Sequence, residues 1–205
     1  MKKKWIFIIA TIFTLTVNAQ DIKLVPPQTT GGMPLMEALA NRKTNRDFTQ
    51  TELTPQQLSN LLWAAAGVNR PDGRRTAPTA RNAQQIEIYV INKTGAYLYL
   101  PKEHTLKLIA TGDHRAKGAS QELFQKCPLM LIFVANYNKM EGFSAESKAM
   151  YEATDAGNIS QNVYLYCASE GLATCALGSI HRDKLQTLLG FNGKAILGQS
   201  VGVAK

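Results

Sequence analysis

Residues 42–46 (RKTNR) place three cations and one hydroxyl within five positions. A planar guanidinium can hold a phosphate in a two-point fork, and a neighbouring lysine and hydroxyl can complete the cradle. Taken alone the cluster is weak evidence, because a short basic run is more often a solvated face. It gains weight from three later segments with distinctive polar or small side chains, which are residues 78–84 (PTARNAQ), 155–162 (DAGNISQN) and 175–179 (CALGS).

Each of these segments lies beside or within an element that the sequence pattern predicts. Residues 34–41 are expected to form a short helix before the first segment, and residues 86–90 alternate like a strand after the second. A long helix over about residues 147–170 carries the third segment. The fourth closes a predicted strand at residues 172–177.

The remaining elements have clear boundary signals. Thr54, Pro55 and Gln57 form the pattern of a capping box with a first-turn proline, and Gly67 ends that helix. Residues 129–135 are continuously apolar, as in a strand buried on both faces. Irregular alternation of helices and strands, with a hairpin, predicts an α+β fold with a mixed sheet. The other predicted elements are strands at residues 97–100 and 195–203, and short helices ending at Phe124 and spanning residues 183–189.

Composition suits one globular domain, because 45% of the 205 residues are hydrophobic. The formal net charge is +8, of which residues 2–4 contribute three charges and the rest of the chain +5. That excess is neither concentrated in one long run nor interleaved with aromatic residues. A nucleic-acid partner is therefore not expected.

Residues 1–19 have the features of an export signal. Three lysines precede a mostly apolar stretch at residues 5–17, which is shorter than the about 20 residues of a membrane span. Val17 and Ala19 suit a cleavage site. We expect cleavage before Gln20, a periplasmic mature chain and no stable membrane insertion. The alternatives are an uncleaved anchor helix and, if the signal is not used, a cytoplasmic protein.

After the signal, residues 20–32 are rich in proline, glycine and polar side chains and predict an extended lead-in to a domain at residues 33–205. Cys127, Cys167 and Cys175 lie in apolar contexts and are expected to be small buried side chains, with a Cys167–Cys175 disulfide as the open alternative. The three histidines are isolated from one another, so no metal site is expected.

In their order and spacing, the four segments resemble the FMN-dependent nitroreductase superfamily from about residue 33 onward. In that family an Arg-x-Ser/Thr-x-Arg/Lys element after the first helix binds the FMN phosphate and ribityl chain. Arg42, Thr44 and Arg46 match this element, and Lys43 fills the position between them. The FMN phosphate is a dianion, for which charge-assisted contacts are a natural anchor.

A second family element, Pro-Ser/Thr-x-x-Asn-x-Gln, places its asparagine at the pyrimidine edge of the flavin. Pro78, Thr79, Asn82 and Gln84 match it. An amide suits that edge because it both donates and accepts hydrogen bonds. The resemblance also puts the extra cation Arg81 near the negative charge of reduced flavin.

A third family element is a strand-end loop against the flavin, which here corresponds to Ala176, Leu177, Gly178 and Ser179. A backbone N–H of Gly178 or Ser179 would approach flavin N5. The family usually has a further arm holding another cation, for which Lys205 is the candidate stand-in. This departure resembles compact branches of the superfamily, including relatives of thiazole/oxazole-forming dehydrogenases.

The long helix matches the family pattern Asp-x-Gly-x-x-x-Gln-Asn through Asp155, Gly157, Gln161 and Asn162. We interpret this helix as mainly structural. The resemblance implies a homodimer with flavin at its interface. On the long helix, small residues predict a face for close packing, namely Ala156, Gly157 and Ser160.

The resemblance implies a nitroreductase-like fold, with a mixed, mainly antiparallel sheet flanked by helices and a long central helix. The predicted cofactor is FMN and not FAD, because the chain has no GxGxxG. The predicted reaction is ping-pong electron transfer from NAD(P)H, or another reductant in the periplasm, to an electron-poor small molecule such as a nitroaromatic or a quinone. Flavin N5 carries the chemistry, so no catalytic side chain is assigned.

Two alternatives come from other classes. The first is a flavin-binding or electron-relay protein without turnover. The second is an interaction domain that keeps the fold but not the flavin, against which the presence of Arg42, Arg46 and Asn82 argues. The yellow colour of a bound flavin separates the last reading from the other two.

Overall fold

An antiparallel sheet forms the centre of the protein. The computed structural model describes residues 20–205, so the predicted export signal lies outside the described residues. In the described chain the sheet has the strand order β1-β4-β3-β2-β5-β7-β6, and every neighbouring pair is antiparallel. The strands are β1 (Ile22–Lys23), β2 (Ile86–Ile91), β3 (Gly95–Leu100), β4 (Thr105–Thr111), β5 (Leu129–Asn136), β6 (Leu172–Leu177) and β7 (Gly193–Val203).

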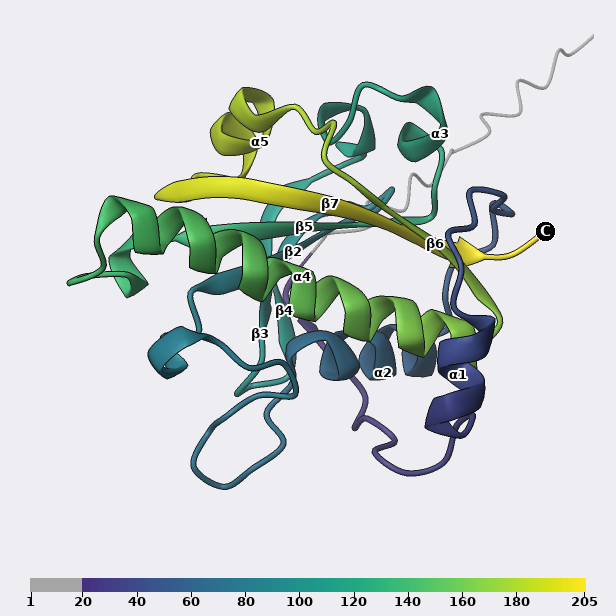
Figure 1. The fold of residues 1–205 in the computed structure, drawn as a ribbon. Coiled ribbons are helices and arrows are strands. Elements are labelled where there is room, and N and C mark those ends of the chain that lie inside the picture. The colour runs from purple at the N-terminus through teal and green to yellow at the C-terminus, as the bar shows by residue number, and fades with distance from the viewer. Residues whose placement is uncertain (1–19) are drawn as a thin grey trace, which may run out of the picture.

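Helices cover both faces of this sheet (Figure 1). One face carries α1 (Leu35–Asn41), α2 (Pro55–Ala66) and α4 (Ala145–Ser169), and the other carries α3 (Glu122–Gln125) and α5 (Arg182–Leu189). Three short 3-10 turns complete the described elements, which are η1 (Ala80–Asn82), η2 (Arg115–Lys117) and η3 (Tyr137–Lys139). The predicted α+β fold with a mainly antiparallel sheet and a long helix is confirmed.

Strand β5 separates two apolar cores. Leu131 and Phe133 belong to the core beneath α2 and α4, whereas Met130 and Ile132 belong to the core beneath α5. All four side chains are fully buried. The uninterrupted apolar run of this strand therefore reflects burial on both faces, as predicted.

The predicted helix boundaries follow from local hydrogen bonds. The Thr54 hydroxyl accepts from the Gln57 N–H, and the Gln57 side chain accepts from the Thr54 N–H, which together make the capping box of α2. Helix α4 ends before Gly171, whose φ of 66° is a conformation that glycine adopts without strain. Strand β4 was not predicted, because most of its residues are only partly buried and its sequence has no clean alternation.

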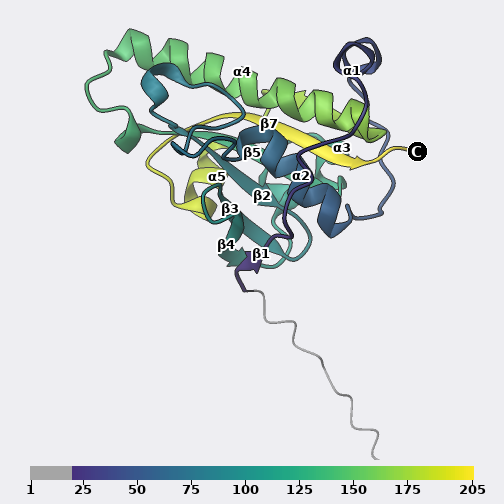
Figure 2. The same ribbon diagram turned by 90° about the horizontal axis from the view of Figure 1, so that it is seen from below.

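Helix α4 lies at the outer surface of the molecule in both ribbon views (Figures 1 and 2). Its inner side packs on the sheet and includes Ala156 and Ser160, both of which are buried. The prediction that Ala156, Gly157 and Ser160 form a packing face for a second copy is therefore wrong for two of the three. Residues 156 and 160 are one turn apart, whereas residue 157 is rotated by about 100°, and Gly157 is exposed.

The three cysteines are buried, as predicted, and no disulfide joins Cys167 to Cys175. Burial raises the pKa of the Cys127 thiol to about 12 and raises the pKa of the Cys167 thiol as well. These side chains therefore pack as neutral groups. Among residues 20–205, no helix has both the length and the apolar character needed to cross a bilayer.

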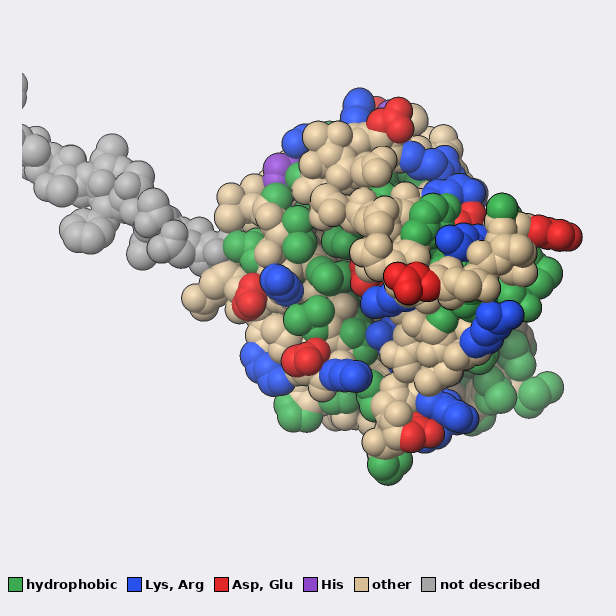
Figure 3. Space-filling view, turned by 90° about the vertical axis from the view of Figure 1, so that its left-hand side faces the viewer, with side chains coloured by type: hydrophobic (Ala, Val, Ile, Leu, Met, Phe, Trp, Pro, Cys, Tyr) green, Lys and Arg blue, Asp and Glu red, His purple; other side chains and the backbone are tan. Residues whose placement is uncertain are grey.

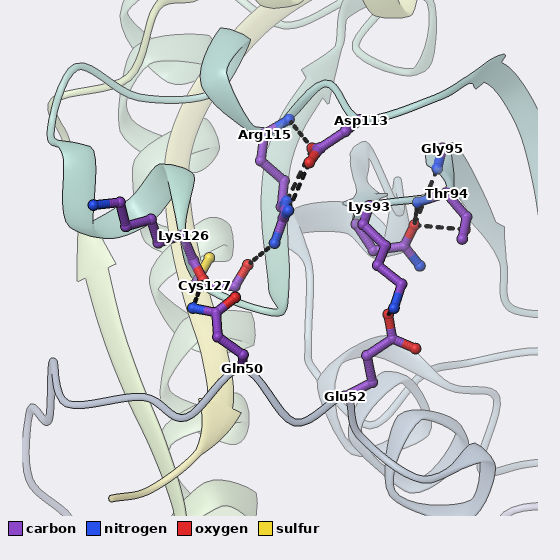
Figure 4. A network of polar contacts seen from close by, with 10 residues as sticks. Gln50, Glu52, Lys93, Thr94, Gly95, Asp113, Arg115, Lys126 and Cys127 are labelled. Carbon is purple, nitrogen blue, oxygen red and sulfur yellow. Dashed lines mark hydrogen bonds and ion pairs between the residues drawn. The ribbon is translucent and has the colours of Figure 1, made fainter.

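A network of polar contacts holds the chain just after residues 42–46 (Figure 4). The Gln50 side chain donates to the carbonyl oxygen of Lys126 at 3.0 Å. Arg115 pairs with Asp113 at 2.6 Å and donates to the carbonyl oxygen of Cys127 at 3.0 Å. The loop that leaves residues 42–46 is thereby attached to the segment that enters β5.

A partly buried histidine attaches the N-terminal segment to the domain. His104 Nε2 lies 2.8 Å from Ser59 Oγ, and His104 Nδ1 lies 2.9 Å from the Tyr99 hydroxyl. Ser59 uses its one proton to donate to the carbonyl oxygen of Val25 at 2.6 Å, so it can only accept from His104. His104 Nε2 therefore carries a proton, and desolvation lowers the pKa of the ring, which favours its neutral form.

We predict that acid weakens the fold through His104. The pKa of His104 is lower in the folded than in the unfolded chain. As the pH falls below about 6.5, the folded chain therefore binds fewer protons than the unfolded chain does. The free energy of unfolding should therefore decrease from pH 7 to pH 5. In urea titrations this decrease should be smaller for His104→Asn, because the variant lacks the titrating ring. Asparagine is chosen because it tolerates the φ of 48° at this position.

The control for this prediction is His114→Asn, because His114 Nε2 lies 2.9 Å from the carbonyl oxygen of Thr111 in its own loop. This variant should keep the unaltered pH dependence. Equal decreases in His104→Asn and the unaltered protein would contradict the assignment.

Candidate functional site

Residues 42–46 run from the end of α1 along the edge strand β6. The Asn45 N–H donates to the carbonyl oxygen of Thr174 at 2.9 Å, and the Lys205 N–H donates to that of Asp47 at 3.2 Å. Phe48 then forms a bridge with Ala204. Strand β6 and the chain beyond β7 therefore set the path of the basic segment.

Tyr164 on α4 joins three of the predicted site residues. Its hydroxyl lies 3.1 Å from Thr44 Oγ1 and accepts the N–H of Ala176 at 2.9 Å. The Arg42 guanidinium lies over its ring, 5.3 Å from the centroid. Sequence reasoning missed Tyr164, because an aromatic residue in a long helix has the signature of a packing residue.

The cations of this segment have no carboxylate partner in the part of the chain that the structure describes. Arg42, Lys43 and Arg46 make no ion pair within 4.0 Å, whereas Arg74 and Arg115 are each paired with an aspartate. Unpaired positive charge on one short segment favours an anionic ligand, and a phosphate dianion most of all.

A hollow of about 290 Å³ opens next to this segment, and only some of the segment's side chains line it. Lys43, Asn45 and Lys205 line the hollow together with Tyr164 and Thr174. Arg42 and Thr44 do not line it, because alternate side chains of an extended segment point to opposite sides. Lys43 and Lys205 thus line the same hollow, whereas Arg42, Thr44 and Ala176 each contact Tyr164.

Residues 78–84 form a second group with an unusual backbone. Arg81, Asn82 and Gln84 have φ values of 53°, 53° and 51°, which few residues other than glycine adopt. Thr79 Oγ1 accepts the Gln84 N–H at 3.0 Å, and the Gln84 side chain donates to the carbonyl oxygen of Gly73 at 3.0 Å. Such strain persists where the surroundings enforce it, and it clusters at functional sites.

The buried carboxylate of Asp155 enforces this conformation from α4. Asp155 Oδ2 accepts the Ala80 N–H at 3.1 Å and the Gln85 side-chain amide at 2.5 Å. Asp155 is 4% exposed and Gln85 is fully buried, so both bonds lie inside the protein. The helix pattern was interpreted as mainly structural, and the structure shows that one of its members positions a candidate binding segment.

Within one chain the two groups contact different parts of α4. Asp155 and Tyr164 are nine residues apart in this helix, which corresponds to about 13 Å along the axis and to opposite sides of it. The structure therefore brings Arg42, Thr44 and Ala176 together, and it places Pro78, Thr79, Arg81, Asn82 and Gln84 elsewhere.

The remaining predicted residues lie where β6 ends. The Leu177 side chain is in the core, so it can offer a ligand only its backbone. Gly178 and Ser179 are exposed, and the carbonyl oxygen of Gly178 accepts from Arg182 at 3.3 Å. Within residues 20–205, no three histidine, cysteine or acidic side chains lie close enough together to hold a metal ion.

Comparison with known proteins places this geometry in context. Residues 39–203 match the nitroreductase family. A nitroreductase homologue from Methanocaldococcus jannaschii is 30% identical over 178 residues, which are 82% of this chain and 90% of that protein. The crystal structure of a nitroreductase homologue from Ralstonia eutropha JMP134 is 40% identical with a TM-score of 0.87, covering 91% of this chain and 90% of its own.

A more distant structure is similar in fold alone. The Escherichia coli microcin synthetase McbBCD complex contains a chain that is 16% identical, with a TM-score of 0.68 over 89% of this chain and 78% of its own.

We predict that Asp155→Ala releases residues 78–85. Loss of a hydrogen bond to a buried carboxylate costs about 1.5–3 kcal/mol, so the Ala80 amide should exchange with solvent at least tenfold faster. Asp155→Asn keeps an acceptor oxygen and should show a smaller effect. Hydrogen exchange measured by NMR would report both, and unchanged protection of Ala80 in Asp155→Ala would contradict the anchoring role.

Proposed function

The chain belongs to the nitroreductase family, and from this premise we propose that it is an FMN-dependent oxidoreductase. The observation that carries the proposal is the unpaired positive charge of residues 42–46 beside the Thr44 hydroxyl and the end of β6. When bound, FMN supplies two-electron transfer from a reductant to an electron-poor acceptor. The reductant and the acceptor occupy the same pocket one after the other.

The side chains have separate tasks in this proposal. Arg42 and Arg46 bind the phosphate through charge-assisted hydrogen bonds, and Thr44 adds a hydroxyl to the cradle. Lys43 and Lys205, which share the hollow beside it, raise the local positive potential. The side-chain amide of Asn82 is exposed on its strained turn and serves the pyrimidine edge of the flavin.

We further propose that two copies of the chain are needed to complete each site. Helix α1 exposes apolar side chains at Leu35 (64%) and Met36 (76%), and α4 exposes Met150 (53%). A shallow groove between the two helices is lined by Leu35 and Leu165. Apolar surface of this kind is typical of an interface.

A second copy on this surface accounts for the separation of the two groups. Residues 42–46 and 78–84 of one chain contact opposite sides of α4. We propose that in a two-fold symmetric pair residues 78–84 of one copy lie beside residues 42–46 of the other. The flavin then lies at the interface and binds both copies.

The export signal leads to a proposal about the electron donor. A chain cleaved before Gln20 would be periplasmic, where nicotinamide cofactors are not the expected reductant, so a membrane quinol or a protein partner would supply electrons. N-terminal sequencing of protein from fractionated cells should begin at Gln20. An intact Met1 in the cytoplasmic fraction would overturn this and make NAD(P)H the default donor.

We predict that Arg42→Ala and Arg46→Ala each weaken FMN binding. Removing one hydrogen-bonded cation from a phosphate should cost about 1.5–3 kcal/mol, which corresponds to roughly a tenfold to 150-fold rise in Kd. Titration of apo-protein with FMN, followed by flavin fluorescence, measures the change. FAD should bind much more weakly than FMN to the unaltered protein.

The matched control for these variants is Arg74→Ala, because Arg74 is an exposed arginine paired with Asp72 at 3.3 Å and distant from residues 42–46 in sequence. Its FMN affinity should stay unaltered. If all three variants bind FMN equally well, or if the unaltered protein binds none, the proposed cradle is refuted.

We predict that a large side chain at position 157 disrupts the proposed dimer. Gly157 is exposed on α4, and an added Cβ would meet no atom of its own chain within 4 Å. In a free helix face Gly157→Ala would stabilise the protein by up to about 1 kcal/mol, whereas Gly157→Arg would be harmless. Against a closely packed second copy, Gly157→Arg should instead produce a monomer by light scattering, with weakened FMN binding. A dimer with unaltered FMN affinity in Gly157→Arg would exclude this face.

A further inference from the structure

Arg81 is held against an aromatic ring at the N-terminal end of α4. Its guanidinium carbon lies 4.6 Å from the centroid of the Phe143 ring. Phe143 in turn meets Tyr151 of α4 edge to face, with centroids 5.8 Å apart and planes at 85°. The ring beneath the guanidinium is therefore supported by the helix.

This placement leaves the donors of Arg81 available. A guanidinium that stacks on a ring keeps the N–H groups around its edge free for other partners. Arg81 is exposed and makes no side-chain hydrogen bond or ion pair with residues 20–205. The nearby Arg70 and Arg74 differ, because Arg70 donates to Asn69 and Arg74 pairs with Asp72.

A second cation is arranged in the same way at this end of the molecule. Lys148 of α4 lies 5.5 Å from the centroid of the Tyr137 ring and has no ion pair in the described chain. The buried carboxylate of Glu152 is already paired with Lys194 at 2.5 Å. Figure 3 shows this end of the molecule, where basic and acidic side chains are interspersed over the surface. In the sequence, Glu141 and Glu146 flank Phe143.

The strained backbone aims Arg81 from the segment that is proposed to meet the flavin. Arg81 and Asn82 are neighbours with the same φ of 53°, and the Asp155 bond to Ala80 fixes the turn that presents them. A ligand beside Asn82 would therefore meet a free guanidinium edge and the Phe143 ring next to it. Such a pair matches a flat ring that carries a carboxylate.

We propose that Arg81 and Phe143 select an electron acceptor that is planar, aromatic and anionic, with its carboxylate bound by Arg81. The proposal rests on the proposed function, since it needs FMN next to residues 78–84. It assigns Arg81 to the acceptor, in place of the role beside reduced flavin that the family resemblance implies.

The test compares two acceptors that differ in charge, 4-nitrobenzoate and 4-nitrobenzyl alcohol, with NADH as the reductant. In the FMN-loaded unaltered protein, kcat/KM should be at least tenfold higher for 4-nitrobenzoate. In Arg81→Asn, which suits the positive φ, this ratio should fall at least tenfold, mainly through KM. Arg74→Asn is the control and should keep the ratio.

A second readout does not depend on turnover. Benzoate should perturb the visible spectrum of the oxidised, FMN-loaded protein, and its Kd should rise at least tenfold in Arg81→Asn. Arg81→Lys, which keeps the charge without the planar fork, should restore part of the loss.

Three results would overturn the inference. If the ratio of kcat/KM for the two acceptors is the same in the unaltered protein and in Arg81→Asn, the inference fails while the proposed function stands. An equal loss with both acceptors, together with a shifted flavin midpoint potential, would assign Arg81 to the flavin instead. Absence of FMN binding would remove the proposed function and this inference together.

Discussion

The site depends on a buried chain of hydrogen bonds that fixes α4 on the sheet. Ser160 donates to Gln199 Oε1 at 2.8 Å, Gln199 Nε2 donates to Thr174 Oγ1 at 3.0 Å, and Thr174 donates to the carbonyl oxygen of Ser200 at 2.8 Å. All four residues are buried, so each unmet partner would cost about 1–3 kcal/mol. This cost sets one rotation of α4, which turns Asp155 to one side and Tyr164 to the other.

That rotation organises the proposed chemistry. Tyr164 gathers Arg42, Thr44 and the end of β6, while Asp155 holds the strained turn that carries Arg81 and Asn82. The cations of the first group have no acidic partner in the described chain, and the second group has a strained backbone with positive φ values. Both features are accounted for if a ligand joins the two groups, and in the proposed dimer a second copy of the chain brings them together across α4.

The parts of this structure that could be predicted are those that local physics decides. The capping box of α2 needs only Thr54 and Gln57, and the apolar run of β5 follows from burial on both faces. The candidate site segments were predicted from residue type, spacing and the family resemblance. The roles of Asp155 and Tyr164 could not be predicted, because they depend on which loops pack beside α4. For the same reason the small residues Ala156 and Ser160 were misjudged, since the helix rotation that buries them is set by Gln199.

The central claim is that residues 42–46 of one copy and residues 78–84 of the other form one FMN site. Mixed dimers of Arg42→Ala and Asn82→Gly chains test it most directly; glycine suits the φ of 53° at position 82. If the claim holds, each parent dimer binds FMN weakly at both sites, while the mixed dimer has one site with both changes and one with neither. Titration of isolated mixed dimers should then show one FMN per dimer at the affinity of the unaltered protein. If the mixed dimer binds no better than its parents, both segments act within one chain and the claim is contradicted.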